Sequence, residues 1–123
     1  MFEPCECGSG TSYLGCCGRL HSGAPARDAE ELMRSRYCAF SRGNAPYLQK
    51  SWAVETRPLI LHLDPAQTWT GLTIDRHEVT GPDTARVRFT ATWRTGTRTG
   101  RMTETSRFRR DGSGWVYIDG TSD

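Results

Sequence analysis

The chain has 123 residues, 24% of them charged and 36% apolar, with a formal net charge of +2 at pH 7. This length provides for one compact domain with its own core and a small additional module. The nearly balanced charge excludes a polycationic nucleic-acid-binding protein, and no apolar run approaches the ~20 residues of a membrane-spanning helix. Residues 1–4 carry neither the basic nor the apolar region of a signal peptide, so we expect a cytoplasmic protein.

Four of the five cysteines fall within the first seventeen residues, at Cys5, Cys7, Cys16 and Cys17. Between the two pairs, Gly8-Ser9-Gly10 allows the backbone to reverse, so that four thiols can surround one ion. This arrangement predicts a structural zinc site, with one Zn²⁺ per chain held by all four cysteines.

Two alternatives to zinc stay open, namely redox or iron chemistry and a set of disulfides. Disulfides normally accompany an oxidising compartment, and vicinal cysteines such as Cys16 and Cys17 rarely bond to each other because the small ring strains the disulfide. A redox pair would usually be a C-x-x-C motif beside a βαβ pattern, which the sequence lacks. We expect the fifth cysteine, Cys38, to be a small buried hydrophobe near Tyr37 and Phe40 rather than a ligand.

The residues around the cysteines read Pro-Cys-Glu-Cys-Gly-Ser-Gly-Thr-Ser-Tyr over 4–13 and Cys-Cys-Gly over 16–18. This pattern resembles the SEC-C motif, a small zinc-binding element known best from the C-terminal tail of the translocase ATPase SecA, where it contacts the chaperone SecB and the ribosome. The resemblance implies zinc ligation by the four cysteines, and the ribosome, its RNA or a secretion chaperone as partner. Two departures lower the local positive charge, because Glu6 replaces a proline and Thr11 a basic residue.

Three regions follow one another along the chain. Residues 1–18 form the predicted zinc knuckle, 19–26 a linker rich in Gly and Pro, and 27–123 the main domain. Asp28 and Glu31 have the spacing of a capping box that opens a helix, and Gly43 offers its C-terminal stop. Asn44 then caps a second, short helix. Apolar residues share one face in each helix: Leu32, Met33, Tyr37 and Phe40 in the first, Leu48 and Trp52 in the second.

Beyond these helices, apolar residues recur with a period of two, which predicts strands. Four strands are expected, one from Trp69 past Ile74 and the others over 86–94, 101–110 and 115–119. Gly96 and Gly100 are expected to bound the turn between the second and third strands, and Asp-Gly-Ser-Gly at 111–114 predicts a hairpin before the fourth. Helices followed by an antiparallel meander indicate an α+β fold with the helices on one face of the sheet.

Short motifs along most of the chain form a second pattern: Leu-Met-Arg-Ser-Arg-Tyr at 32–37, Trp52, Thr-Arg-Pro at 56–58, Glu-Thr-Ser-Arg-Phe at 104–108 and Trp-Val-Tyr-Ile-Asp-Gly at 115–120. They resemble the YchJ-like family of uncharacterised bacterial proteins, which carry a SEC-C knuckle ahead of a domain similar to nuclear transport factor two and ketosteroid isomerase. The resemblance implies a cone-like domain, with helices packed on a curved antiparallel sheet. Ala53 and Thr103 stand where relatives usually carry histidine, so the sequence does not favour an enzyme.

Strand alternation places polar residues on an apolar sheet face. Pairing Arg94 with Arg101 and Arg110 with Trp115 puts five candidate pocket residues on the inner face: Trp93, Glu104, Ser106, Tyr117 and Asp119. The sequence favours a scaffold, in which Glu104 or Asp119 forms an ion pair with Arg34 or Arg36 of the covering helix. Unpaired carboxylates in apolar surroundings would instead have raised pKa values, so the alternative is a ligand pocket in a small-molecule-binding protein or minor enzyme.

The opposite sheet face is rich in arginine, with eight Arg and one Glu between residues 86 and 110. Six of them share the outer face as candidate anion-binding residues: Arg86, Arg88, Arg94, Arg101, Arg107 and Arg109. Because no aromatic residue is interleaved on this face, any nucleic-acid contact would be with backbone phosphates rather than bases. The alternative is a solvated strand face in an arginine-biased proteome. Two functions remain, a zinc-binding adaptor for the ribosome, its RNA or a secretion chaperone, and a small-molecule-binding protein.

Overall fold

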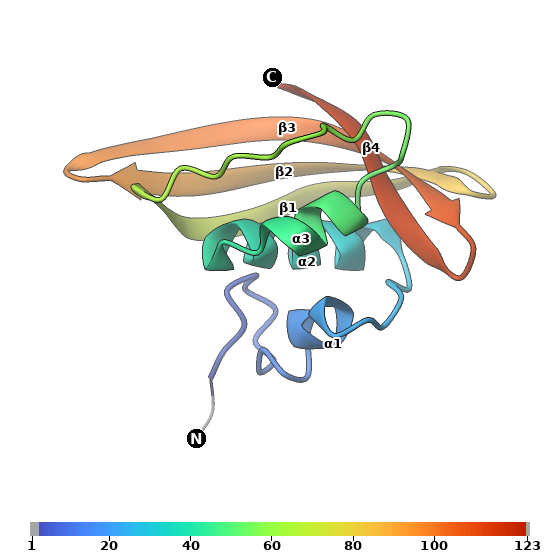
Figure 1. Cartoon of the computed structure of the whole chain (residues 1–123), viewed down its shortest axis with the longest axis horizontal. Helices are drawn as coiled ribbons and strands as arrows, with labels where there is room; N and C mark the ends of the chain where they lie inside the picture. The colour runs from blue at the N-terminus through green and yellow to red at the C-terminus, as the bar shows by residue number, and fades with distance from the viewer. Residues whose placement is uncertain (1–2, 123) are drawn as a thin grey trace.

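The structure is a computed structural model that describes residues 3–122. Within that range lie the helices α1 (Cys17–His21), α2 (Ala29–Arg42) and α3 (Ala45–Lys50), followed by the strands β1 (Gln67–Gly81), β2 (Thr84–Thr95), β3 (Arg98–Asp111) and β4 (Gly114–Ser122). The strands form one antiparallel sheet in the order β1-β2-β3-β4, and α2 lies across one face of it (Figure 1). The α+β fold class expected from the sequence is confirmed.

The helix boundaries follow from local chemistry. The Asp28 side chain accepts a hydrogen bond from the backbone N–H of Glu31 at 2.8 Å, and Gly43 ends α2 in the left-handed conformation at φ 70°. Asn44 caps α3 by accepting from the N–H of Tyr47 at 3.2 Å. These caps confirm the predicted starts and stops. α3 ends at Lys50, so Trp52 lies beyond the helix, where its backbone pairs with Tyr117.

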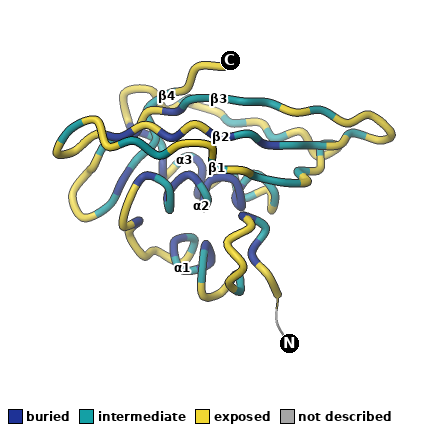
Figure 2. Tube along the Cα trace, turned by 180° about the vertical axis from the view of Figure 1, so that it is seen from behind, coloured by how far each residue is buried: buried dark blue, intermediate teal, exposed yellow. Residues whose placement is uncertain are grey.

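Helix α2 is the middle layer of the molecule, between the sheet on one side and the cysteine-rich segment with α1 on the other (Figures 1 and 2). One continuous core joins the three layers, because Cys7 and Leu20 belong to the same buried cluster as Val87 and Phe108 of the sheet. Removal of this apolar surface from water is the main stabilising term of the fold. Helix α1 continues past residue 18, where the predicted zinc knuckle ends. The expected boundaries between the knuckle, the linker and the main domain remain predictions.

The β2–β3 connection is tighter than the sequence analysis expected. Thr95 pairs with Arg98, so the turn is Gly96-Thr97 and Gly100 lies inside β3 opposite Trp93. A side chain at position 100 would collide with the Trp93 ring, which shows that this glycine permits close packing rather than a turn. The expected pairing of Arg94 with Arg101 is therefore wrong. The register moves by two residues, so each side chain keeps its predicted sheet face.

The β3–β4 hairpin has the predicted turn and an unpredicted bulge. Arg110 pairs with Trp115 and Phe108 with Tyr117, as expected. Between Arg107 and Phe108 the register shifts, so that Asp119 pairs with Arg107 instead of Ser106. The placement of Asp119 on the inner face is therefore wrong, because the bulge turns it to the outer face.

The segment between α3 and β1 has no helix or strand. Leu61 and Leu63 pack against the core, whereas Leu59 and Ile60 are exposed. Across residues 3–122, none of the helices has the length and apolar character needed to cross a membrane.

Candidate functional site

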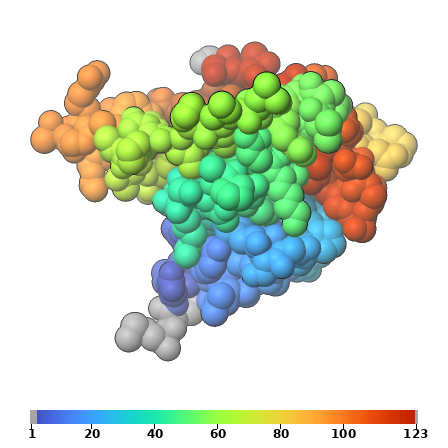
Figure 3. All heavy atoms as spheres, viewed as in Figure 1, coloured from blue at the N-terminus to red at the C-terminus, as the bar shows by residue number. Residues whose placement is uncertain are grey.

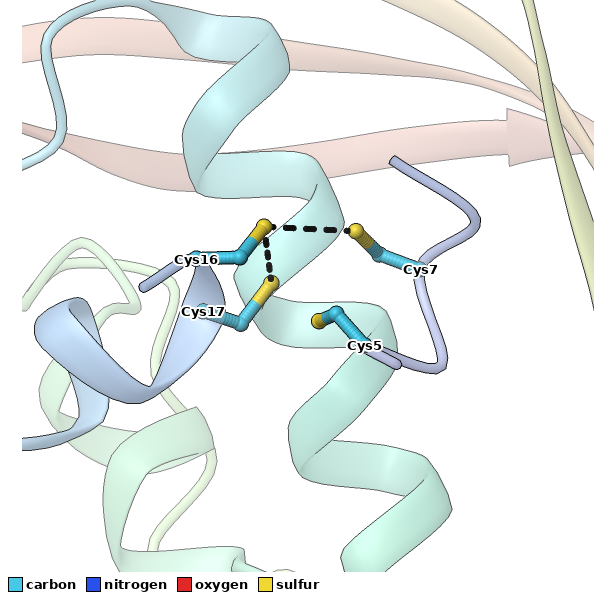
Figure 4. A group of neighbouring side chains, drawn as sticks. All are labelled: Cys5, Cys7, Cys16 and Cys17. Carbon is cyan, nitrogen blue, oxygen red and sulfur yellow. Dashed lines mark hydrogen bonds between the residues drawn. The ribbon is translucent and has the colours of Figure 1, made fainter. Parts of the chain in front are cut away.

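The four N-terminal cysteines converge on one point beside α2 (Figure 4). The sulfur atoms of Cys5, Cys7, Cys16 and Cys17 all lie within 4.8 Å of one another. Cys16 Sγ is 3.7 Å from Cys7 Sγ and 4.0 Å from Cys17 Sγ. Four sulfurs placed tetrahedrally at ~2.3 Å from one ion would lie ~3.8 Å apart. The donor atoms therefore fit a single tetrahedral metal ion, and all five cysteines are free thiols.

The backbone of the first segment reverses at two glycines. Gly8 and Gly10 have φ angles of 82° and 85°, which residues with a Cβ rarely adopt. The turn is closed by the N–H of Cys5, which donates to Thr11 O at 2.9 Å, and by the N–H of Gly8, which donates to Cys5 O at 3.1 Å. This reversal carries Cys5 and Cys7 back toward the second pair of cysteines at the start of α1.

Polar contacts fasten the cysteine-rich segment to α2. Arg42 donates from Nε to Glu6 at 2.6 Å and from NH2 to Glu3 at 3.0 Å, and its guanidinium lies 3.4 Å from the ring centroid of Tyr13. Arg34 donates to the carbonyl of Cys7 at 2.7 Å. Glu6, which departs from the usual SEC-C pattern, thus has a structural role, because it pairs with a cation of the neighbouring helix.

His21 makes a further connection between the segment and α2. Its Nε2 lies 2.8 Å from the carbonyl of Ser35, and its Nδ1 lies 2.7 Å from the hydroxyl of Tyr13. A carbonyl can only accept, so Nε2 carries the proton and Nδ1 accepts from Tyr13. Both ring nitrogens are occupied in this way, which makes His21 a structural residue rather than a metal ligand.

Cys38 lies closer to this site than its sequence position predicted. It is fully buried in α2, as expected, but its sulfur lies 3.2 Å from that of Cys5. The sequence carried no signal for this contact, because it depends on α2 packing against the knuckle. Cys38 therefore borders the cluster without belonging to the group formed by the four N-terminal thiols.

The thiols influence each other's ionisation. Hydrogen bonds from the Cys17 and Cys38 thiols hold the pKa of Cys7 below its usual value, whereas burial raises the pKa of Cys16. Crowded groups of like charge cannot all ionise without a compensating cation. The arrangement therefore favours full deprotonation only when a metal ion is bound.

A second candidate site is a cavity of about 250 Å³ between α2 and the sheet. Of the five predicted pocket residues, Glu104, Ser106 and Tyr117 line it, whereas Trp93 and Asp119 do not. Trp93 packs over Gly100 instead, and Asp119 pairs with Arg107 at 2.7 Å on the outer face.

The expected ion pair between Glu104 and the covering helix is absent from the described part of the chain. Arg34 pairs with Glu30 at 3.1 Å, and Arg36 donates to the Leu48 carbonyl and the Ser51 hydroxyl. Glu104 instead accepts from Ser106 at 3.2 Å, and burial raises its pKa. The scaffold hypothesis for Glu104 is therefore wrong, because Arg36 is drawn toward α3 and the Trp52 and Tyr117 rings.

The outer arginine face is partly neutralised by carboxylates. Arg86 pairs with Glu78, Arg107 with Asp119 and Arg109 with Glu55. The side chains of Arg94 and Arg101, in contrast, have neither a hydrogen bond nor an ion pair with any residue of 3–122, and the same holds for the side chain of Arg98 beside the β2–β3 turn. Uncompensated positive charge is thus concentrated at this hairpin.

Comparisons with known proteins agree with this architecture. A solution structure of a SEC-C motif containing protein from Rhodopseudomonas palustris superposes with a TM-score of 0.85 at 28% identity, covering 100% of this chain and 99% of the other. A crystal structure of a SEC-C motif containing protein from Psychrobacter arcticus has the same fold, with a TM-score of 0.80 at 24% identity, over 100% of this chain and 83% of the other.

Relatives in sequence cover almost the whole chain. A UPF0225 protein of Xanthomonas oryzae pv. oryzae is 51% identical over 120 residues, 95% of this chain and 93% of that protein. A UPF0225 protein of Streptomyces coelicolor is 48% identical over 118 residues, 95% of this chain and 94% of that protein. The family described as "YchJ, middle NTF2-like domain" matches residues 28–120. The chain therefore belongs to the YchJ-like family, with its NTF2-like domain following the cysteine cluster.

Proposed function

We propose that the chain binds one Zn²⁺ through Cys5, Cys7, Cys16 and Cys17, and that this ion has a structural role. The observation that carries the proposal is the sulfur spacing of 3.7 and 4.0 Å, which agrees with the ~3.8 Å edge of a tetrahedral zinc–thiolate site. Four protein ligands leave no open coordination position for a substrate, which separates this site from a catalytic one.

Zinc is preferred over the other metals that thiolates bind. An all-sulfur tetrahedral donor set suits zinc or iron among the common cellular metals, and excludes magnesium and calcium, which take oxygen ligands. Little apolar surface is available to fold the segment 3–18 by itself, so metal binding would supply much of its folding free energy. Iron remains the alternative, which elemental analysis distinguishes.

The test of the metal site compares two cysteine variants. Protein purified under reducing conditions should contain about one equivalent of zinc by elemental analysis, and Cys7→Ser should lose most of it. Cys38→Ser is the matched control, because Cys38 is a buried cysteine in contact with the cluster but outside the proposed donor set. Retention of zinc by Cys38→Ser supports the assignment, and equal loss in both variants contradicts it.

We further propose that the folded protein acts as an adaptor that contacts ribosomal RNA through the β2–β3 hairpin. This hairpin projects beyond the helices (Figures 1 and 3), and it carries the exposed, uncompensated side chains of Arg94, Arg98 and Arg101. Exposed arginines without acid partners can neutralise phosphates and release their counterions, which favours binding. Arginines that are already paired with carboxylates contribute less binding free energy, because their charge is partly neutralised.

Two triple variants separate these two sets of arginines. Replacing Arg94, Arg98 and Arg101 with Ser should weaken co-sedimentation with ribosomes. The slope of log affinity against log salt concentration should also become less steep, by up to about 3. The control replaces Arg86, Arg107 and Arg109, which are paired with carboxylates, and should bind nearly as the parent does. Equal binding by all three proteins would contradict the adaptor proposal and would direct attention to a protein partner such as a secretion chaperone.

A further inference from the structure

The cavity between α2 and the sheet combines apolar walls with two charged side chains. Phe89, Ala91 and Met102 contribute to its apolar lining, and Arg36 and Glu104 are its charged residues. Phe40, Trp69 and Met102, which also line it, are only partly buried, so a ligand can enter from solvent. The volume of about 250 Å³ lies below the ~300–1,000 Å³ of pockets for larger ligands, which restricts the occupant to a small molecule.

Arg36 is a buried cation that has no carboxylate partner among residues 3–122. Only 3% of the residue is exposed, and NH1 donates to the Leu48 carbonyl at 2.9 Å and to the Ser51 hydroxyl at 2.7 Å. The guanidinium lies 4.9 Å from the Trp52 ring and 4.4 Å from the Tyr117 ring, so its orientation is held. Its Nε and NH2 have no acceptor among residues 3–122, which leaves three of its five N–H donors available.

Glu104 is the complementary group in the same cavity. Its Oε2 accepts from the Ser106 hydroxyl at 3.2 Å, and within the described chain Oε1 has no donor. The carboxyl group is packed over Gly120, where an added Cβ would lie 2.7 Å from the carboxyl carbon. Arg36 and Glu104 therefore line one cavity in fixed orientations, yet they form no ion pair with each other within 4.0 Å.

Opposite charges that are held apart in an apolar cavity are complementary to a ligand that carries both charges. A ligand with only a carboxylate would be attracted by Arg36 but repelled by Glu104. A ligand with only an amine would be attracted by Glu104 but repelled by Arg36. A zwitterion satisfies both, because its carboxylate can accept two N–H bonds from the guanidinium while its ammonium group faces the Glu104 carboxylate. Trp52, whose ring also lines the cavity, has a buried indole Nε1 that lacks an acceptor among the described residues, so one more donor adjoins this region.

We propose that this cavity binds a free α-amino acid with an apolar side chain. The ligand carboxylate accepts hydrogen bonds from Arg36, and its ammonium group pairs with Glu104. Its apolar side chain packs against Phe89, Ala91 and Met102. The site is distinct from the cysteine cluster, and its occupancy does not depend on the role proposed for the metal.

The test uses L-phenylalanine and two truncated probes on the zinc-loaded, full-length protein. Isothermal titration should show L-phenylalanine binding at least about tenfold more tightly than 3-phenylpropanoate, which lacks the ammonium, or 2-phenylethylamine, which lacks the carboxylate. Amide resonances of Ser106 and Tyr117 should shift on binding. This comparison needs no variant, so it cannot be confused with a failure to fold.

A charge-neutralising substitution provides the second arm. Glu104→Gln should weaken L-phenylalanine about tenfold and tighten 3-phenylpropanoate, so that the preference for the zwitterion disappears. Asp119→Asn is the matched control, because this carboxylate lies outside the cavity and should leave both affinities unchanged. Absence of saturable binding up to the solubility limit of L-phenylalanine would overturn the proposal. Equal affinities for the three probes, or an unchanged preference in Glu104→Gln, would also overturn it.

Discussion

Arg42, at the end of α2, joins the cysteine-rich segment to the domain, and its removal measures how strongly the two are held together. The Glu3 carboxylate that it contacts is 74% exposed, so this ion pair contributes little. The pair with Glu6, at 2.6 Å, and the stacking on Tyr13 each contribute about 0.5–1 kcal/mol. We therefore expect Arg42→Ala to lower the free energy of unfolding by about 1–2 kcal/mol.

Urea denaturation of the zinc-loaded protein, followed by tryptophan fluorescence, measures this difference. Arg27→Ala is the control, because Arg27 is 75% exposed and its pair with Glu31 spans 3.6 Å, so it should change stability by less than about 0.5 kcal/mol. Combining Arg42→Ala with Glu6→Gln should cost less than the sum of the two single changes, because both remove the same pair. Strict additivity, or an Arg42→Ala loss no larger than that of the control, would refute the reasoning.

Three further predictions concern the sheet and its cavity. Gly100→Ala should destabilise the fold by about 1–3 kcal/mol in thermal unfolding, because a Cβ there collides with the Trp93 ring; an unchanged midpoint would mean that the β2–β3 register is wrong. Glu104→Gln should change stability by less than about 1 kcal/mol, because no ion pair is lost, and a loss of about 3 kcal/mol or more would contradict the assignment of Ser106 rather than Arg36 as the Glu104 partner. Burial raises the pKa values of Tyr37 and Tyr47 to about 12, so the folded state keeps these protons above the ~10 of the unfolded chain. Stability should therefore fall as pH rises from about 10 toward 12, and an absorbance titration in which all tyrosines ionise near 10 in the folded protein would contradict this.

Local chemistry made the helices and the last hairpin predictable from sequence. Asp28, Gly43 and Asn44 act on backbone groups only a few residues away, so their roles do not depend on the rest of the fold. The same holds for the turn at 111–114, which brings Arg110 opposite Trp115. The four-cysteine cluster was also predictable, because both pairs lie within a short segment that reverses at two glycines.

The errors arose where a residue's role depends on distant partners. Gly100 resembled a turn residue, but it is required by the ring of Trp93 on the neighbouring strand. The bulge opposite Arg107 and Phe108, where Ile118 is the extra residue of β4, has no signature in the sequence of that strand, and it moved Asp119 to the outer face. The contact between Cys38 and Cys5 depends on how α2 packs against the knuckle, which no local pattern encodes.

The difference between prediction and structure that matters most for function is the position of the Arg36 guanidinium. Charge alone made Glu104 its natural partner, but the neighbouring carbonyl of Leu48, the Ser51 hydroxyl and two aromatic rings hold the guanidinium elsewhere. The consequence is a cavity that contains two separated charges in place of a closed ion pair. This difference changes the expected role of the site from scaffold to ligand binding.

The central claim, a structural zinc ion held by four cysteines, is tested most directly by X-ray absorption at the zinc edge on protein purified without added metal. We predict four sulfur neighbours at ~2.3 Å and no nitrogen or oxygen ligand. A first shell containing nitrogen or oxygen, or protein that carries iron or no metal at all, would contradict the account.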